Sequence, residues 1–312
     1  MGTGKSSAAI NYMNDNKDTK FIYITPYLDE AARIKEGCPD LRFVEPSAKI
    51  REYGFRKYQH TMALIKEGRN ISTTHQSFVR YTQDTLDDIK EQGYCLIVDE
   101  SVSTLESAEF HIADLQLALD AGYVAEEGDE YVLINDEYNG SALREMFNLL
   151  KSRRLIRLRS EYGEKLFYWT LPSELLTSFR DVYILTYLFE GQSLYYFMQM
   201  YNLSYERIGI RRGGDGGYHF CEDPDYVPDY VANLPDMIDI LDNDRMNAVG
   251  DSRVALSASW YDRDERNPEV IRKNMTNYFN NICKDVPADR KLWGTFKGVK
   301  HSIQFKGYTN AF

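Results

Sequence analysis

The chain has 312 residues, and 43% of them are hydrophobic, which is enough apolar surface for one or two sizeable cores. The formal net charge of -11 excludes a surface that is uniformly built to bind phosphate backbones, so a nucleic-acid site would have to be local. The sequence contains no run of roughly 18 apolar residues, no signal-peptide pattern and no C-x-x-C pair among its four cysteines. These absences predict a cytoplasmic protein that has no membrane partner.

A phosphate-binding pattern stands at the start of the chain. The end of the motif G-x-x-x-x-G-K-[ST] is matched by Gly2, Thr3, Gly4, Lys5, Ser6 and Ser7, and a helical pattern follows. In such a loop the backbone N–H groups surround a phosphate at a helix N-terminus, Lys5 reaches the β and γ phosphates, and the Ser6 hydroxyl binds Mg²⁺. The motif residues are therefore our candidate ligands for ATP and Mg²⁺. A chance GKS in a glycine-rich turn is the alternative.

Three strands with helices between them are predicted next. Residues 20–25, 70–73 and 94–98 are short apolar runs of the kind that form buried strands, and helical patterns at 27–35 and 50–67 separate them. This alternation predicts an α/β fold in which helices cover both faces of a parallel sheet.

Two acidic residues follow the third of these strands. Asp99 and Glu100 come directly after the apolar run, at the carboxyl end where parallel sheets bind their ligands. Asp99 can hold Mg²⁺, and Glu100 can accept a proton from the water that attacks the γ-phosphate. Because the pair follows GKS in the order typical of P-loop ATPases, Lys5, Asp99 and Glu100 are our candidate catalytic residues. A solvated turn is the alternative for the acidic pair alone.

The segment 103–180 breaks the alternation of strands and helices. Its short amphipathic helices and polar, hairpin-like strands predict an inserted α+β accessory unit, so 1–102 and 181–212 are expected to form the ATPase domain. The insertion carries a basic cluster among aromatic residues, which suits backbone contact and base stacking on nucleic acid, although a solvated charged face is the commoner explanation. The cluster consists of Lys151, Arg153, Arg154, Arg157 and Arg159, beside Tyr162, Phe167, Tyr168 and Trp169.

The last part of the chain is expected to contain a linker and a second unit. Residues 213–250 are acidic and contain Gly and Pro, which predicts a long loop or linker. The apolar run RVALSA then predicts a strand that opens a second α/β unit at 251–312.

Four segments together resemble the first motor domain of superfamily 2 (DEAD/DEAH-like) helicases, in particular the replication helicases of phages and prophages. They are GTGKSS, ITPYLDEAARI, ISTTHQSF and LIVDES. The resemblance implies a P-loop NTPase (RecA-like) fold, ATP-driven movement on DNA or unwinding of it, replication proteins as partners and, for a phage protein, the host cytoplasm. It also implies that Thr25, Thr74 and Gln76 contact the nucleic-acid backbone, a role that suits short polar side chains at strand ends. Capping of the helix near His75 is the alternative for Thr74.

The resemblance extends less completely to the rest of the chain. Thr186 matches the family's coupling motif, which links the ATP site to the nucleic-acid track, while LSASW and KGYTNAF resemble parts of a second, truncated RecA-like domain at 251–312. The first glycine of the phosphate loop would precede Met1, and the family's arginine motif would follow Phe312. We therefore expect a fragment that binds Mg-ATP weakly and does not unwind a duplex.

Two other classes of protein share parts of this pattern. A small-molecule kinase or a packaging motor also combines GKS with an acidic strand end, although a kinase would need an arginine-bearing lid that the sequence does not clearly show. An ATP-gated binding module without turnover is the third possibility. Stimulation of ATP hydrolysis by nucleic acid would separate the helicase from both.

Overall fold

The computed structural model describes residues 4–54, 56–159, 165–226, 233, 257–264 and 266–287. The chain divides into two compact units, Met1–Pro228 and Asp229–Phe312, and each is described here by itself. Gly2, Thr3, Tyr162, most of the expected linker and the segment KGYTNAF lie outside the described residues.

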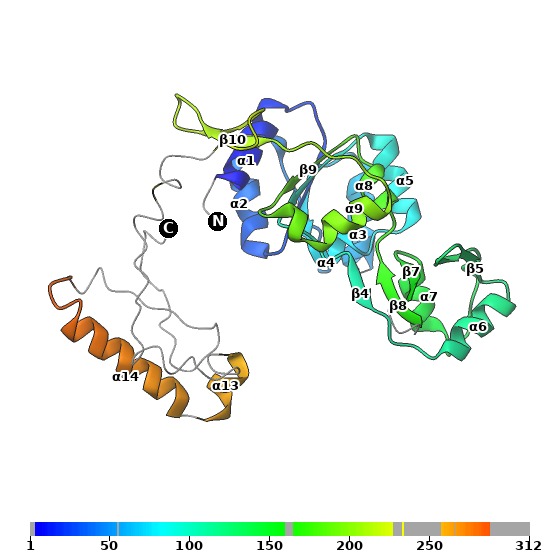
Figure 1. Cartoon of the computed structure of the whole chain (residues 1–312). Helices are drawn as coiled ribbons and strands as arrows, with labels where there is room; N and C mark the ends of the chain where they lie inside the picture. The colour runs from blue at the N-terminus through cyan, green and yellow to red at the C-terminus, as the bar shows by residue number, and fades with distance from the viewer. Residues whose placement is uncertain are drawn as a thin grey trace. The chain divides into compact units, whose positions relative to one another are not determined.

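The first unit is built on a parallel sheet of four strands (Figure 1). In the order β2-β1-β3-β9, the strands are Ile71–Thr74, Phe21–Thr25, Cys95–Asp99 and Asp181–Leu185. The three predicted strands correspond to β1, β2 and β3 and are confirmed, each to within one residue at either end. All residues of β1 and β3 are buried, which explains why their sequences are continuous apolar runs rather than alternating ones.

Helices cover both faces of this sheet, as predicted. Phe21 and Tyr23 of β1 point to the face that is covered by α1 (Lys5–Asp15) and α2 (Leu28–Gly37). Ile22 and Ile24 point to the other face, because successive side chains of a strand alternate. That second core is completed by α3, α4, α5, α8 and α9, which span Lys57–Lys66, His75–Phe78, Gln83–Gln92, Glu174–Thr177 and Ser193–Met200.

The single helix predicted over 50–67 is wrong in its first third. The structure has a 3-10 turn at Arg51–Tyr53, and α3 begins only at Lys57. Gly54 separates the two with a φ of 62°, in the left-handed region that ends helices and that glycine adopts without a steric penalty. Further 3-10 turns lie at Pro39–Leu41 and Phe189–Gly191.

A second, antiparallel sheet lies within the segment that breaks the alternation. Its strand order is β4-β8-β7-β6-β5, with bounds Leu105–Ser107, Lys165–Thr170, Arg154–Arg159, Glu130–Leu133 and Val124–Glu127. Together with α6 (Ile112–Asp120) and α7 (Arg144–Leu150) it encloses a core of its own around Phe147 and Trp169. The residues that follow β8 behave differently, because Leu171, Leu175, Leu176 and Phe179 pack into the core of the parallel sheet.

Replacing residues 105–170 with a short Gly-Ser linker should therefore leave the parallel-sheet core folded. Leu105 and Thr170 are paired neighbours across β4 and β8, so the two cut ends already lie side by side. Replacing the whole of 103–180 should instead prevent folding, because it removes four buried side chains whose loss costs about 8 to 20 kcal/mol together. Thermal unfolding followed by circular dichroism checks both. Cooperative melting of both variants would show that 171–179 is not part of that core.

The expected boundary between the ATPase domain and the linker, at 212/213, falls inside a β-hairpin that the sequence interpretation missed. Strands β10 (Gly209–Arg212) and β11 (Tyr218–Cys221) pair antiparallel, and β11 is the strand of this hairpin that packs on α1 (Figure 1). The glycines between them form the turn: Gly216 has a φ of 79°, and the Asp215 carboxylate accepts a hydrogen bond from the Gly217 N–H at 2.9 Å. Composition alone made this turn look like a linker.

In the second unit the structure describes two helices, α13 (Ala258–Arg263) and α14 (Arg266–Asn281). The expected strand RVALSA lies outside the described residues up to 256, and its last two residues open α13. Ser257 is the N-cap, and its hydroxyl accepts a hydrogen bond from the Trp260 N–H at 3.2 Å. No helix in the described part of either unit is long and apolar enough to cross a membrane.

Candidate functional site

The N-terminus of α1 is shaped by a glycine that no other residue could replace easily. Gly4 is the N-cap, and its φ of 82° lies in the left-handed region. A Cβ atom at this position would also lie 2.3 Å from the ring of Tyr218, which is far inside van der Waals contact. Two independent constraints therefore require glycine immediately before Lys5.

Ser6 and Asp99 meet at the carboxyl edge of the sheet. The Ser6 hydroxyl donates a hydrogen bond to Asp99 Oδ2 at 3.2 Å, although the two residues are 93 positions apart in sequence. Ser6 lies in the first turn of α1 and Asp99 ends the central strand β3. The structure thus brings together the two residues that we expected to share one ion.

Tyr23 adds a second donor to the same carboxylate oxygen. Its hydroxyl lies 3.0 Å from Asp99 Oδ2 and is buried. Burial and the neighbouring Asp99 carboxylate raise the pKa of Tyr23, so the phenol keeps its proton and remains a donor at every physiological pH. Sequence reasoning missed Tyr23, although the alternation along β1 places it on the face of α1, beside Ser6.

Two buried tyrosines allow the Tyr23 hydrogen bond to be tested. Tyr23→Phe should lower the free energy of unfolding by about 1.5 to 3 kcal/mol, because it removes a donor from a buried carboxylate. The matched control is Tyr81→Phe: the buried Tyr81 hydroxyl has no hydrogen-bond partner within the described part of the chain, so its removal should be neutral or stabilising. Urea denaturation measures both changes. Equal losses in the two variants would contradict a special role for the Tyr23 hydroxyl.

Glu100 follows Asp99 with an unusual backbone conformation. Its φ of 62° is in the left-handed region, which for a residue other than glycine costs on the order of 1 kcal/mol or more. Its N–H continues the ladder by donating to the Leu185 carbonyl at 3.1 Å, while its side chain is exposed. The turn thereby sends the carboxylates of Asp99 and Glu100 in different directions, one into the protein and one into solvent.

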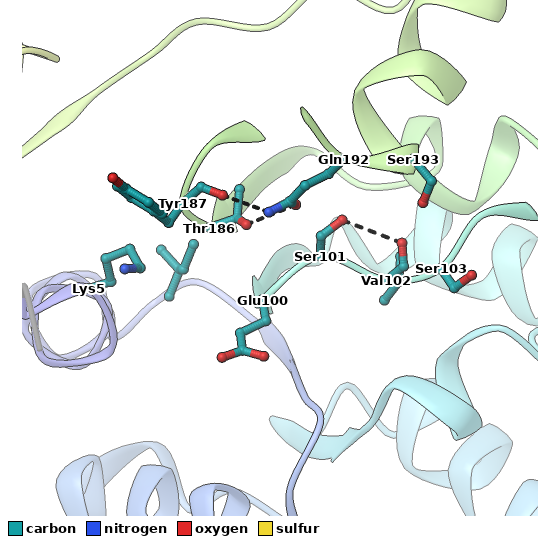
Figure 2. A pocket seen from close by; sticks show the side chains of 10 residues that line it. Lys5, Glu100, Ser101, Val102, Ser103, Thr186, Tyr187, Gln192 and Ser193 are labelled. Carbon is teal, nitrogen blue, oxygen red and sulfur yellow. Dashed lines mark hydrogen bonds between the residues drawn. The ribbon is translucent and has the colours of Figure 1, made fainter. Parts of the chain in front are cut away.

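Lys5 and Glu100 line one cleft of about 540 Å³ (Figure 2). The remaining lining is rich in hydroxyl groups and comes from the chain after β3 and from the last residue of β9 onward. It consists of Ser101, Val102, Ser103, Leu185, Thr186, Tyr187, Gln192 and Ser193. In Figure 2, Lys5 and Glu100 come from separate elements, with Thr186 and Tyr187 beside them.

His75 forms a hydrogen bond with the backbone at the end of β3. Its Nε2 lies 2.9 Å from the Asp99 carbonyl oxygen, which can only accept, so Nε2 carries the proton. Burial lowers the pKa of His75, outweighing the opposite effect of this hydrogen bond, and the ring is neutral at pH 7. His75 was recognised in sequence only as part of a motif, because nothing local indicates its contact with residue 99.

The candidate nucleic-acid residues do not form one surface. Thr25 and Thr74 are register partners at the ends of β1 and β2, but the Thr25 side chain is fully buried and accepts a hydrogen bond from the Tyr27 N–H at 3.4 Å. Thr25 therefore does not present its hydroxyl to a ligand here. Thr74 is the N-cap of α4 and shares a hydrogen bond of 3.3 Å with Ser77, whereas Gln76 is exposed.

Thr186, our candidate coupling residue, lines the cleft together with Lys5 and Glu100. Its hydroxyl donates to Gln192 Oε1 at 2.9 Å, and Gln192 Nε2 donates to the Tyr187 carbonyl at 2.6 Å. Gln192 thus ties the start of α9 to the end of β9. Sequence reasoning did not identify Gln192, because its hydrogen-bond partners lie on the other side of a 3-10 turn.

The basic cluster of the insertion is largely neutralised by acidic neighbours. Four of its side chains form ion pairs: Lys151 with Asp136, Arg153 with Glu106, Arg154 with Glu174, and Arg157 with Glu126 and Asp129. Trp169 is buried in the core of the antiparallel sheet. These pairings favour the structural explanation of the cluster over contact with nucleic acid.

The oxygen atoms of Ser6 and Asp99 fit a magnesium ion. Mg²⁺ prefers hard oxygen ligands at 2.0–2.1 Å, so two adjacent ligands of an octahedral ion lie about 2.9 Å apart. The observed separation of 3.2 Å is close to this value. Within the described residues no group of three or more His, Cys, Asp and Glu side chains could hold a metal. A magnesium ion held by Ser6 and Asp99 would need its remaining oxygen ligands from other sources, such as a phosphate and water.

Comparison with known proteins gives two matches. Residues 232–312 match a family described as the YonV C-terminal Rossmann-like domain. The whole chain is similar to the SPbeta prophage-derived uncharacterized protein YonV of Bacillus subtilis (strain 168), with 29% identity over 321 residues that cover 100% of this chain and 77% of the relative. No solved structure matches the chain. The family match begins at residue 232, inside the stretch that we had interpreted as a linker.

Proposed function

We propose that the chain is a P-loop (RecA-like) ATP hydrolase of the helicase or translocase type, acting on DNA. The observation that carries the proposal is the hydrogen bond between Ser6 and Asp99, because a GKS serine and a strand-end aspartate share one Mg²⁺ in P-loop NTPases. The common cleft of Lys5 and Glu100 supports the same reading, and its volume of about 540 Å³ is in the range of small-molecule sites.

Each residue of the site then has a distinct task. Lys5 supplies a positive charge to the β and γ phosphates, while Ser6 and Asp99 would hold Mg²⁺. The ion, when bound with the nucleotide, neutralises charge on the phosphate oxygens. Glu100 accepts the proton of the attacking water, a task that its exposed carboxylate permits and the buried one of Asp99 does not.

The nucleic-acid part of the proposal depends on fewer observations. The exposed Gln76 and the N-cap Thr74 lie at the same carboxyl edge of the sheet as Asp99. The prophage origin of the YonV relative accords with a task in phage DNA replication. The net charge of -11 requires such a contact to be small and local.

Phosphate release from Mg-ATP, measured alone and with single-stranded DNA, duplex DNA or single-stranded RNA, tests the proposal. We expect hydrolysis that DNA accelerates. Hydrolysis that no nucleic acid changes would favour another P-loop ATPase, such as a packaging motor or kinase, and binding without turnover would favour an ATP-gated module. Absence of nucleotide binding would contradict all three.

A further inference from the structure

Several contacts hold the β10–β11 hairpin against α1 and determine which of its two faces points inward. Asn11 Nδ2 donates to the Tyr218 carbonyl at 2.9 Å. Phe220 stacks on Tyr183 of β9, with ring centroids 5.5 Å apart and planes 4° apart, and its ring centroid lies 5.7 Å from that of Tyr12. The hairpin therefore belongs to the core on the α1 side of the parallel sheet.

The inward-facing side chains of this hairpin extend from the core to the N-terminus of α1. Side chains alternate along a strand, so Tyr218 and Phe220 share a face, and the register adds their partners Arg212 and Ile210. Phe220 faces the core, whereas the half-buried Tyr218 lies across Gly4, one residue before Lys5. Tyr218 thus places an aromatic ring beside Gly4, and Arg212 is its register partner on the neighbouring strand.

We propose that this pair forms the nucleoside subsite of the nucleotide site, with Tyr218 stacking on the base and Arg212 facing the polar ribose and α-phosphate side. The inference rests on the proposed function, because it takes the phosphates to be held at α1. Lys5 and Glu100 mark the reacting end in the cleft, and the hairpin contributes no residue to the lining of that cleft. Gly4 directly precedes Lys5, so a nucleoside on the Gly4 side of the bound phosphates would contact Tyr218.

Stacking explains the choice of side chain better than packing alone. Every base has a π-face, and an aromatic ring next to a phosphate site holds it without a demand on sequence or orientation. Arg212, the register partner of Tyr218, is exposed and donates from Nε to the Gly216 carbonyl at 3.2 Å, and an arginine supplies a positive charge to this face of the hairpin.

Calorimetric titration of the whole chain with Mg-ATP and with Mg-tripolyphosphate separates the base from the phosphates. Tyr218→Ala should weaken Mg-ATP binding roughly tenfold to a hundredfold and leave tripolyphosphate binding within about twofold. Tyr218→Phe should retain both affinities. The matched control is His219→Ala on the same strand, which faces the other way and pairs with Asp215, and it should also retain both.

The outcomes are distinguishable from failure of the proposed function. If the unaltered chain binds neither ligand, the nucleotide site itself is wrong. If Tyr218→Ala binds Mg-ATP normally, or loses both ligands equally, only the nucleoside subsite is overturned. Photo-crosslinking of the unaltered chain with 8-azido-ATP gives an answer that needs no variant: we expect the label on residues 209–221, and labelling confined to other segments would overturn the inference.

Discussion

Lys5→Ala should abolish measurable binding of Mg-ATP while the protein remains folded. The ammonium group is placed in the first turn of α1 and faces the same cleft as Glu100. A hydrogen bond between charged groups is worth about 1.5 to 3 kcal/mol, and a lysine that touches two phosphates makes at least two of them, so we expect the affinity to fall by a hundredfold or more. Titration with a fluorescent ATP analogue measures the loss.

A second lysine provides the control for the change in charge. Lys17 lies two residues beyond the end of α1 and pairs with the exposed Asp40. Lys17→Ala makes the same change in net charge at a surface ion pair, which contributes little to stability or binding. It should bind Mg-ATP as the unaltered chain does. A dissociation constant for Lys5→Ala within twofold of that control would remove Lys5 from the phosphate site.

The sequence predicted the sheet and the meeting of Ser6 with Asp99 for one physical reason. Strands that are buried on both faces must be largely apolar, so β1 and β3 are visible as short continuous runs. Parallel strands place their carboxyl ends along one edge, and a helix that follows the phosphate loop begins at that edge. The proximity of the two motifs therefore follows from topology without knowledge of any side-chain contact.

Contacts between distant segments could not be predicted in this way. The Tyr218 carbonyl and Asn11 are 207 positions apart, and the strand that carries Tyr218 was hidden in an acidic, glycine-rich stretch. The basic cluster was visible in the sequence. Its neutralisation could not be predicted, because the acidic partners come from other parts of the chain. The segment that contains Leu175 and Phe179 was assigned to the insertion from its sequence. Both side chains pack on the parallel sheet, because the chain returns to it after β8.

Glu100→Gln should keep Mg-ATP binding and lose turnover. The amide has nearly the same shape as the carboxylate, so the left-handed backbone at a φ of 62° is retained and only the base is removed. General base catalysis contributes about 10² to 10⁴ in rate, and we expect phosphate release to fall by that factor. Quenched-flow measurement of a single turnover, together with ATP titration, separates the chemical step from binding.

A second Glu→Gln variant, at a residue that does not line the cleft, shows whether the loss of turnover is specific to Glu100. Glu91→Gln on α5 makes the same chemical change at an exposed helix position and should leave both rate and affinity unchanged. Glu100→Gly offers an independent readout, since it relieves the strained φ: it should raise the free energy of unfolding by about 1 kcal/mol and still lose turnover. A functional residue in a strained conformation should show this opposition between stability and activity. If Glu100→Gln hydrolysed ATP at the rate of Glu91→Gln, Glu100 would not be the base, and its exposed carboxylate would need another explanation.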